Sequence, residues 1–290
     1  MNACDERFFR LYRRRRRKNA IMTLIIRLCV ALAVLPLASI LGYVTWRGLG
    51  AVSLDFLTRL PAPVGASGGG MANSIVGSGI VVGLAALMGI PVGVLAGIYL
   101  AEYGRRHRFG STVRFLADVL QGIPSIVVGI VAFTLVVLPM QTFSAVAGAI
   151  ALSMMLAPFV ARTTEEAILT VSDDIREAGM ALGQPHWRVI LSVILGSSRG
   201  PLVTGLMLGV ARIAGETAPL LFTALNNRFW HRSLLEPIST LTVQLYTYAI
   251  APFDDWNQQA WAGAFVLTTL ILVINVMART AARSKYVERS

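Results

Sequence analysis

Long apolar runs alternate with short polar stretches along almost the whole chain. A helix needs about 20 apolar residues to cross the hydrocarbon core of a bilayer. Six segments are long and apolar enough to do so: Ala20–Tyr43, Ser74–Ala101, Phe115–Leu138, Phe143–Arg162, Pro201–Ala224 and Ala260–Ala278. The pattern therefore predicts an all-α membrane protein with six transmembrane helices. These helices form one membrane domain over residues 20–278, between an N-terminal tail (residues 1–19) and a C-terminal tail (residues 279–290).

The composition also indicates a membrane protein. Of the 290 residues, 55% are apolar and only 14% are charged, and the mean hydropathy of +0.66 is far from that of an average soluble domain. The first segment has the basic start and apolar core of a secretory signal. Its apolar part is too long for one and no convincing cleavage site precedes Trp46, so we expect an uncleaved first helix. Cys4 is expected in the cytosol and Cys29 in the membrane, which disfavours a disulfide.

Basic residues gather on one side of the predicted membrane. The net charge is +11, and most arginines precede the first segment or follow the second, the fourth and the sixth. The opposite side carries Arg47, Arg59, Arg228 and Arg232. Because cytoplasmic loops are enriched in arginine and lysine, we expect both termini and the loop after the fourth segment in the cytoplasm. The distribution favours an anchor near anionic headgroups over nucleic-acid binding, and residues 1–19 are expected to be a mobile basic tail.

Small residues and a proline predict how two of the helices are built. Gly89, Gly93 and Gly97 recur at every fourth residue of the second segment, and this spacing lets helix backbones approach closely in lipid. We therefore expect this helix inside a bundle. In the third segment, Gly122-Ile-Pro-Ser125 predicts a kink, because proline removes a helical hydrogen bond. Residues 226–259 are expected to form an external loop with a short interfacial helix anchored by aromatic side chains.

The charged, amphipathic stretch between the fourth and fifth segments carries Glu177-Ala-Gly-Met-Ala-Leu-Gly183, followed by Val193-Ile-Leu195. It resembles the EAA loop of ABC importer permeases, the cytoplasmic elbow that docks on the ATPase. Gly179 stands where that family has a second alanine, and Gly196 stands where it has a proline.

The resemblance implies a type I ABC importer permease (MetI-like) fold with a coupling loop at about residues 163–200. It also implies that Glu177, Ala178 and Gly183 couple the permease to the ATPase. A short helix at this place can fit a groove on the partner, and Gly183 would let the chain turn or approach closely. An amphipathic linker that merely lies on the surface is the alternative.

Two charged residues lie inside the fifth apolar segment. Arg212 and Glu216 are four residues apart, so they are expected to share a helix face. Charged side chains at this depth in the membrane cost free energy unless they pair with an opposite charge or are reached by water. Two interpretations remain open: the residues form a structural ion pair, or their helix face lines an ion pathway. Arginine suits a tetrahedral oxyanion because its planar fork donates two parallel hydrogen bonds, and Glu216 would hold the guanidinium in place.

Several strings around and beyond this pair carry a second resemblance. They are Ala211-Arg-Ile-Ala-Gly-Glu-Thr-Ala-Pro-Leu-Leu-Phe-Thr-Ala224, Gly97-Ile-Tyr-Leu-Ala-Glu-Tyr103, Gly122-Ile-Pro-Ser-Ile-Val-Val-Gly129 and Pro252-Phe-Asp-Asp-Trp256. They resemble the PstA-type permeases of phosphate ABC importers, and the resemblance extends over about residues 72–277.

This resemblance implies a permease subunit of an ATP-driven phosphate importer in the bacterial inner membrane, with Arg212, Glu216 and Thr217 on the substrate pathway. The implied partners are inorganic phosphate, a PstC-type sister permease, two PstB-type ATPase subunits and a PstS-type extracytoplasmic binding protein. A permease for another oxyanion, such as sulfate or molybdate, remains the alternative.

An enzymatic role is disfavoured. A P-loop needs Gly-Lys before Ser or Thr, and the chain's two lysines, Lys18 and Lys285, do not follow a glycine. ATP hydrolysis is therefore expected in a separate subunit, and an intramembrane hydrolase lacks a Gly-x-Ser-x-Gly motif. The three histidines lie far apart, so we expect no metal site, and we expect no cofactor. Glu165 and Glu166 are expected to be solvated, and an additional regulatory or scaffold role remains open.

Overall fold

The structure of the chain is a computed structural model that describes residues 3–63, 68–105 and 107–283. The predicted C-terminal tail beyond residue 283 and the side chain of Cys4 lie outside the described part. The helices are α1 (Ala3–Leu49), α2 (Leu54–Thr58), α3 (Ala72–Ile98), η1 (Tyr99–Tyr103), α4 (Arg108–Gly122), α5 (Ser125–Ala132), η2 (Phe133–Val137), α6 (Leu138–Met140), α7 (Ala145–Leu169), α8 (Asp173–Ala181), α9 (His186–Val189), η3 (Ile190–Ile194), α10 (Leu195–Ser197), α11 (Arg199–Ala214), α12 (Ala218–Thr223), α13 (Leu241–Ala249) and α14 (Asp254–Arg283). The three η elements are π-helical turns.

Four stretches of helix in the described residues are long and apolar enough to cross a membrane, and two bent pairs raise the number to as many as six. The four are Tyr12–Leu49, Ala72–Tyr103, Ala145–Leu169 and Asp254–Met277. The pairs are Arg108–Gly122 with Ser125–Met140, bent by 102°, and His186–Ser197 with Arg199–Ala214, bent by 76°. The all-α membrane fold predicted from the sequence is confirmed.

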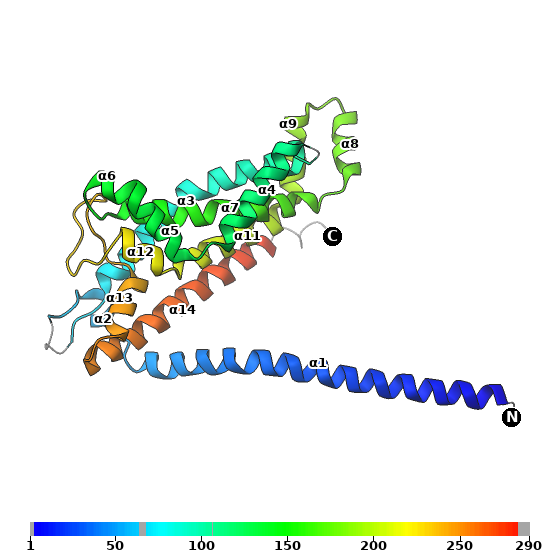
Figure 1. The fold of residues 1–290 in the computed structure, drawn as a ribbon, viewed down its shortest axis with the longest axis horizontal. Helices are drawn as coiled ribbons and strands as arrows, with labels where there is room; N and C mark the ends of the chain where they lie inside the picture. Colours follow the sequence, from blue (N-terminus) through cyan, green and yellow to red (C-terminus); the bar gives the residue numbers. More distant parts are fainter. Residues whose placement is uncertain (1–2, 64–67, 106, 284–290) are drawn as a thin grey trace.

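Helix α1 is longer than predicted and stands apart from the other helices over most of its length (Figure 1). The described part of the basic N-terminal tail is helical, because α1 already begins at Ala3. Arginine and lysine are good helix formers, so the basic run continues the helix. Near its C-terminal end α1 packs on α14, where the rings of Tyr43 and Trp261 meet edge-on at 5.1 Å between centroids. The apolar window of α1 is wholly exposed in the single chain.

Helices α3 and α7 pack along much of their length, and the glycines of α3 make this possible. A Cβ added at Gly93 would lie 2.6 Å from the Cβ of Val160, and one at Gly97 would lie 2.5 Å from the Cβ of Thr164. Gly89 lies one turn earlier and also faces α7. The packing predicted from the glycine spacing is therefore confirmed, since any larger residue would separate the two backbones.

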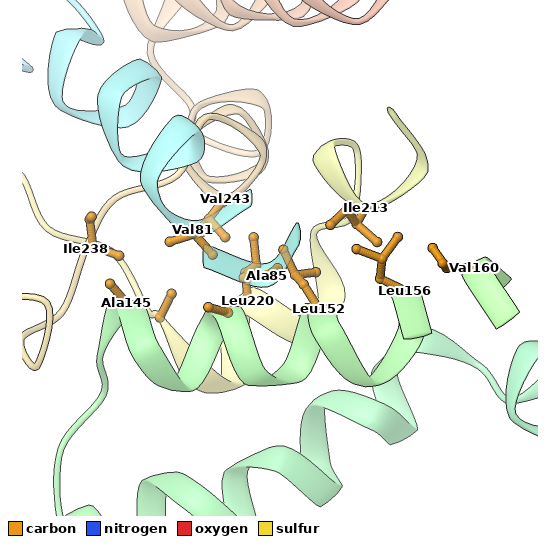
Figure 2. Packing of buried hydrophobic residues seen from close by; sticks show 12 residues of the cluster. Val81, Ala85, Ala145, Leu152, Leu156, Val160, Ile213, Leu220, Ile238 and Val243 are labelled. Atoms are coloured by element: carbon orange, nitrogen blue, oxygen red, sulfur yellow. The ribbon is translucent and has the colours of Figure 1, made fainter. Parts of the chain in front are cut away.

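The central core lies where α3, α7 and α12 meet. Figure 2 shows Val81 and Ala85 of α3 against Leu152 and Leu156 of α7 and Leu220 of α12, all of them buried. Lipid tails are as apolar as leucine, so association of helices in a membrane depends on close packing more than on removal from water. The small residues and this interdigitated layer together hold the bundle.

The third predicted span is a broken helix rather than a kinked one. Helix α4 ends at Gly122, Ile123 and Pro124 are extended with ψ of 133°, and α5 begins at Ser125. The residue before a proline is disfavoured in the helical conformation, which explains why the break begins at Ile123. The resulting bend of 102° is far larger than the predicted kink.

The fifth predicted span, Pro201–Ala224, is also interrupted. Helix α11 ends at Ala214 and α12 begins at Ala218. Pro219 has no N–H to donate to the carbonyl four residues earlier, that of Gly215, and its ring clashes with it. The expectation of one continuous helix is therefore wrong at this place, and the break falls on the charged residues singled out above.

The segment between α12 and α14 is tied to the bundle more firmly than a surface loop. In α13, Gln244 and Tyr248 are buried, and the ring of Tyr248 stacks on that of Trp256 at 4.5 Å. The Oγ of Ser78 in α3 accepts a hydrogen bond from the N–H of Leu241 at 2.7 Å. This segment and α2 lie at one end of the bundle, and α8 and α9 lie at the other (Figure 1).

Candidate functional site

The last turn of α11 presents Arg212 to open space. Its side chain is exposed in the single chain, and its guanidinium carbon lies 5.7 Å from the centre of the Phe159 ring in α7. A cation over an aromatic face is attracted by the ring quadrupole, so Phe159 orients the guanidinium. Within the described residues Arg212 forms no ion pair. Its hydrogen-bond donors are thus available to a ligand.

Glu216 lies beyond the end of α11, so the expectation that it shares a helix face with Arg212 is wrong. The helix has already ended at Ala214, and the N–H of Glu216 makes a turn contact with the carbonyl of Ile213 at 3.2 Å. The carbonyl of Glu216 accepts a hydrogen bond from the Oγ1 of Thr242 in α13 at 3.0 Å. No Arg212–Glu216 ion pair forms in the described part of the chain, which speaks against a purely structural pair.

Thr217 is the third predicted pathway residue, and it occupies the same break. It is the residue before α12, and its carbonyl accepts the N–H groups of Leu220 and Leu221 at 3.1 and 3.2 Å. Non-helical backbone at membrane depth is tolerated only where protein buries it or where it lines a water-filled cavity. The break therefore brings Arg212, Glu216 and Thr217 together, although not in the geometry of a single helix.

A group of buried and half-buried polar side chains was missed from the sequence. The hydroxyls of Ser74 and Ser239 lie 2.7 Å apart, and the Nδ2 of Asn226 donates to the Oε1 of Gln244 at 2.8 Å. Such contacts hold helices together in lipid, where water cannot satisfy the groups. Three of these residues fall in the stretch expected to be an external loop, and single serines and amides carry no periodic signal.

The coupling loop folds as two short helices joined by a tight turn. Helix α8 begins with Asp173 and Asp174, whose charges suit the positive end of the helix dipole. It ends at Ala181, and Gly183 follows with φ of +76°, the left-handed conformation that glycine adopts without strain. Helix α9 then starts at His186. Gly183 thus makes the turn predicted for it.

The outer side of this elbow is exposed and partly apolar. Glu177 and Ala178 are both exposed. Leu182 is 84% exposed and Trp187 is 56% exposed, with Ile175 and Met180 exposed beside them. An apolar surface with a polar rim marks a site of protein–protein contact. The predicted coupling residues Glu177, Ala178 and Gly183 are all exposed on this elbow.

The inner side of α8 carries a charge cluster that the sequence did not reveal, with the side chains of Arg176 and Glu102 buried and those of Arg105 and Asp173 exposed. The Nε of Arg176 lies 3.1 Å from the Oε1 of Glu102 in η1, and its Nη1 lies 2.8 Å from the Oδ1 of Asp173. Arg105 also reaches Asp173, at 3.1 Å. The hydrogen bond from Arg105, together with its charge, holds the pKa of the Asp173 carboxyl below its ordinary value.

A second charge cluster contradicts the expectation that Glu165 is solvated. Glu165 is only 2% exposed. Its Oε1 lies 2.5 Å from the Nε of Arg114 in α4, and its Oε2 lies 2.6 Å from the Nη1 of Arg162 in its own helix. Glu166, the next residue, is exposed as predicted. Buried charges are retained only where they are paired and hydrogen-bonded, and the guanidinium of Arg114 also donates to the carbonyl of Leu100 at 2.7 Å.

Several apolar spans, a helix break that carries charged residues and an exposed elbow together describe a multi-pass membrane protein. The chain belongs to the family described as the binding-protein-dependent transport system inner membrane component, which matches residues 89–285. Proteins of this family are inner-membrane permeases, so the chain is a multi-pass protein of that membrane.

Two bacterial relatives are similar to this chain over most of its length. The chain is 43% identical over 265 residues to the phosphate transport system permease protein PstA of Yersinia pestis, which is 91% of this chain and 90% of the relative. It is 44% identical over 266 residues to the protein of the same name from Haemophilus influenzae, again 91% of this chain and 94% of the relative.

Solved structures of ABC transporters share the fold. A bacterial ABC transporter involved in the import of the acidic polysaccharide alginate gives a TM-score of 0.63 at 14% identity, covering 94% of this chain and 98% of that one. The inward-facing MetNI methionine ABC transporter gives 0.58 at 18% identity, covering 73% and 92%. At these identities the likeness concerns the fold alone, and it agrees with the MetI-like fold expected from the coupling loop.

Proposed function

We propose that this chain is the PstA-type permease subunit of an ATP-driven importer of inorganic phosphate. The observation that carries the proposal is the identity of 43% and 44% to relatives named phosphate transport system permease protein PstA, over nine-tenths of the chain. These names favour phosphate over sulfate and molybdate. The chain contributes half of the translocation pathway and hydrolyses no ATP itself.

The substrate pathway passes the break between α11 and α12. Arg212 is exposed, unpaired within the described residues and oriented by Phe159, so its planar fork can donate two parallel hydrogen bonds to a phosphate oxyanion. Glu216 keeps the empty site near neutral, and Thr217 adds polar groups at the same place. A permease needs an attraction that is weak enough to release the ion, because tight binding would trap it.

The coupling loop docks on the ATPase. Glu177, Ala178 and Gly183 lie on an exposed elbow with an apolar surface, which is the composition that a protein partner covers. The ATPase is a separate PstB-type subunit, present in two copies, because this chain has no Gly-Lys P-loop. Closure of the two ATPases moves the elbow, and the helices then alternate between inward and outward openings.

The remaining partners complete the pathway. A PstC-type sister permease supplies the other half of the translocation pathway. The apolar segment of α1 and the side chain of Arg212 are both exposed in the single chain, which agrees with such a neighbour. A PstS-type binding protein delivers phosphate at the external face. The arginine distribution favours an orientation with both termini and the coupling loop in the cytoplasm.

Reconstitution tests this function. The chain is co-expressed with PstC-, PstB- and PstS-type proteins, purified as a complex and placed in liposomes with ATP on the PstB side. We expect uptake of labelled phosphate and phosphate-stimulated ATP hydrolysis, with little uptake of sulfate or molybdate. Uptake of sulfate or molybdate in preference to phosphate would overturn the substrate, and ATP-independent flux would overturn the mechanism.

A further inference from the structure

Arg176 makes four polar contacts that reach three parts of the fold. Its side chain is only 8% exposed, and it lies between two exposed neighbours on the coupling helix, Ile175 and Glu177. Its Nε donates to the Oε1 of Glu102 at 3.1 Å, and its Nη1 donates to the Oδ1 of Asp173 at 2.8 Å. The guanidinium also donates to two backbone carbonyls.

Those two carbonyls belong to the end of α7. The Nη2 of Arg176 reaches the carbonyl of Ile168 in the last turn of α7 at 3.0 Å, and its Nη1 reaches the carbonyl of Val171 just beyond the helix at 2.5 Å. The last carbonyls of a helix have no helical partner and are satisfied by other donors. One planar guanidinium therefore joins α8 to the end of α7 and, through Glu102, to the π-helical turn that ends α3.

Glu102 extends the same connection to α9. Its side chain is 3% exposed, and its second oxygen lies 3.4 Å from the Nε2 of His186. The inner face of α8 also touches α9 directly, because a Cβ at Gly179 would lie 2.9 Å from the Cγ1 of Val189. The inner face of α8 is thus fixed to two helix ends, while its outer face is free for a partner.

The helices that Arg176 reaches lead to the proposed substrate pathway. The glycines of α3 lie in close contact with α7, as Gly93 does with Val160, and this packing leaves the two helices little freedom to move apart. Nine residues before Ile168, about 14 Å along the same helix, Phe159 lies under the guanidinium of Arg212. A displacement of α7 therefore reaches the break between α11 and α12.

We propose that Arg176 locks the coupling helix α8 to the ends of α3 and α7, so that these helices move as one body when the ATPase moves. This inference rests on the proposed function. Arg176 is a positioning residue: it lies on the inner face of α8, away from the ATPase, and it transmits motion because its planar fork and full charge satisfy acceptors on both helix ends. The exposed pair of Arg105 and Asp173, with side chains 37% and 69% exposed, contributes little.

The test measures phosphate transported per ATP hydrolysed in the reconstituted complex. Arg176→Gln removes the charge and most of the donors, and Glu102→Gln removes the charge of the partner. For each variant that assembles, we expect ATP hydrolysis close to the wild-type rate and a fall of about tenfold in phosphate per ATP, within the usual range of coupling between protein sites. The control Arg105→Gln, which breaks only the exposed pair, should keep the wild-type ratio.

Three outcomes separate the readings. A purely structural role predicts less assembled complex with an unchanged ratio, so a wild-type ratio in either assembled variant overturns the proposal. Failure of both variants to assemble also overturns it, because the cluster would then be needed for folding itself. Failure of the proposed function is distinguishable, since it appears in the wild-type complex as absence of ATP-driven phosphate uptake before any variant is compared.

Discussion

The Nε of Arg114 in α4 lies 2.5 Å from the Oε1 of Glu165 in α7, and this contact joins two residues that are 51 positions apart in the chain. The second oxygen of Glu165 faces Arg162 at 2.6 Å. Glu165 is almost fully buried, whereas Glu166 beside it is exposed. Two adjacent residues of the same type therefore stand in opposite environments and form a matched pair for mutation.

Glu165→Gln should destabilise the purified chain strongly, and Glu166→Gln should not. Removal of one partner from a buried ion pair typically costs about 3–5 kcal/mol, and we expect the lower end because Arg114 and Arg162 remain partly exposed. Thermal unfolding followed by size-exclusion fluorescence gives the two Tm values. Equal Tm values for the two variants would show that the buried cluster contributes nothing to stability.

The glycines of α3 should differ in their tolerance of alanine. A Cβ at Gly93 would lie 2.6 Å from the Cβ of Val160 and 2.7 Å from the carbonyl oxygen of Ala157, whereas one at Gly83 meets nothing within 4 Å. Gly93→Ala should cost about 1–3 kcal/mol by overpacking. Gly83→Ala should be neutral or gain about 0.5–1 kcal/mol from helix propensity. Thermal unfolding of the two variants measures the difference, and equal or reversed shifts would contradict the close packing.

The features that sequence could predict are those encoded locally. Apolar length indicated the spans, and the four-residue spacing of Gly89, Gly93 and Gly97 indicated which face of α3 packs closely, as the contacts with α7 confirm. The turn at Gly183 was equally local, because a glycine after an amphipathic stretch can adopt a positive φ.

The charge clusters that were missed depend on residues far apart in the chain. Nothing near Glu165 in the sequence names Arg114 as its partner, and Arg176 meets Glu102 across 74 residues. Residues four apart share a helix face only where the helix is continuous, so the spacing of Arg212 and Glu216 predicted the wrong geometry. Pro219, which prevents that continuity, is present in the sequence and could have marked the break.

The coupling turn should depend on the conformation of Gly183 rather than on space around it. Its φ is +76° and a Cβ there meets nothing within 4 Å. Gly183→Val should reshape the elbow, because a left-handed conformation costs an ordinary residue about 1–2 kcal/mol. Gly183→Asn is the control, since asparagine tolerates this conformation. We expect Val to lower the amount of ATPase that copurifies and Asn to retain it. Equal copurification would mean that this turn is not part of the contact.

The orientation of the chain can be measured with single cysteines at Ser172 and Ser233, after replacement of Cys4 and Cys29 by serine. Both positions are exposed, and they belong to opposite ends of the bundle. An impermeant thiol reagent added to intact cells should label position 233 and spare position 172, because the arginine distribution favours a cytoplasmic coupling loop. Labelling of position 172 alone would reverse the orientation and remove the basis for ATPase docking at this elbow.

The role of Arg212 can be separated from a structural one because it forms no ion pair in the described part of the chain. Arg212→Gln keeps polarity and much of the size, so the variant should assemble normally. Phosphate uptake should fall by about 10- to 150-fold, which corresponds to the ~1.5–3 kcal/mol of a hydrogen bond to a charged group. The control is Arg228→Gln, since Arg228 is also exposed and lies over an aromatic ring, that of Trp256 at 5.3 Å, but outside the break.

The double variant Arg212→Gln/Glu216→Gln decides between the two readings left open by the sequence. A structural ion pair predicts that two neutral amides satisfy each other and restore both assembly and uptake. A pathway role predicts assembly without uptake, because no fixed positive charge remains to attract phosphate. The absence of an Arg212–Glu216 contact, together with the open side of the guanidinium, favours the second result. Uptake near the wild-type rate in the assembled double variant would falsify the pathway role of Arg212.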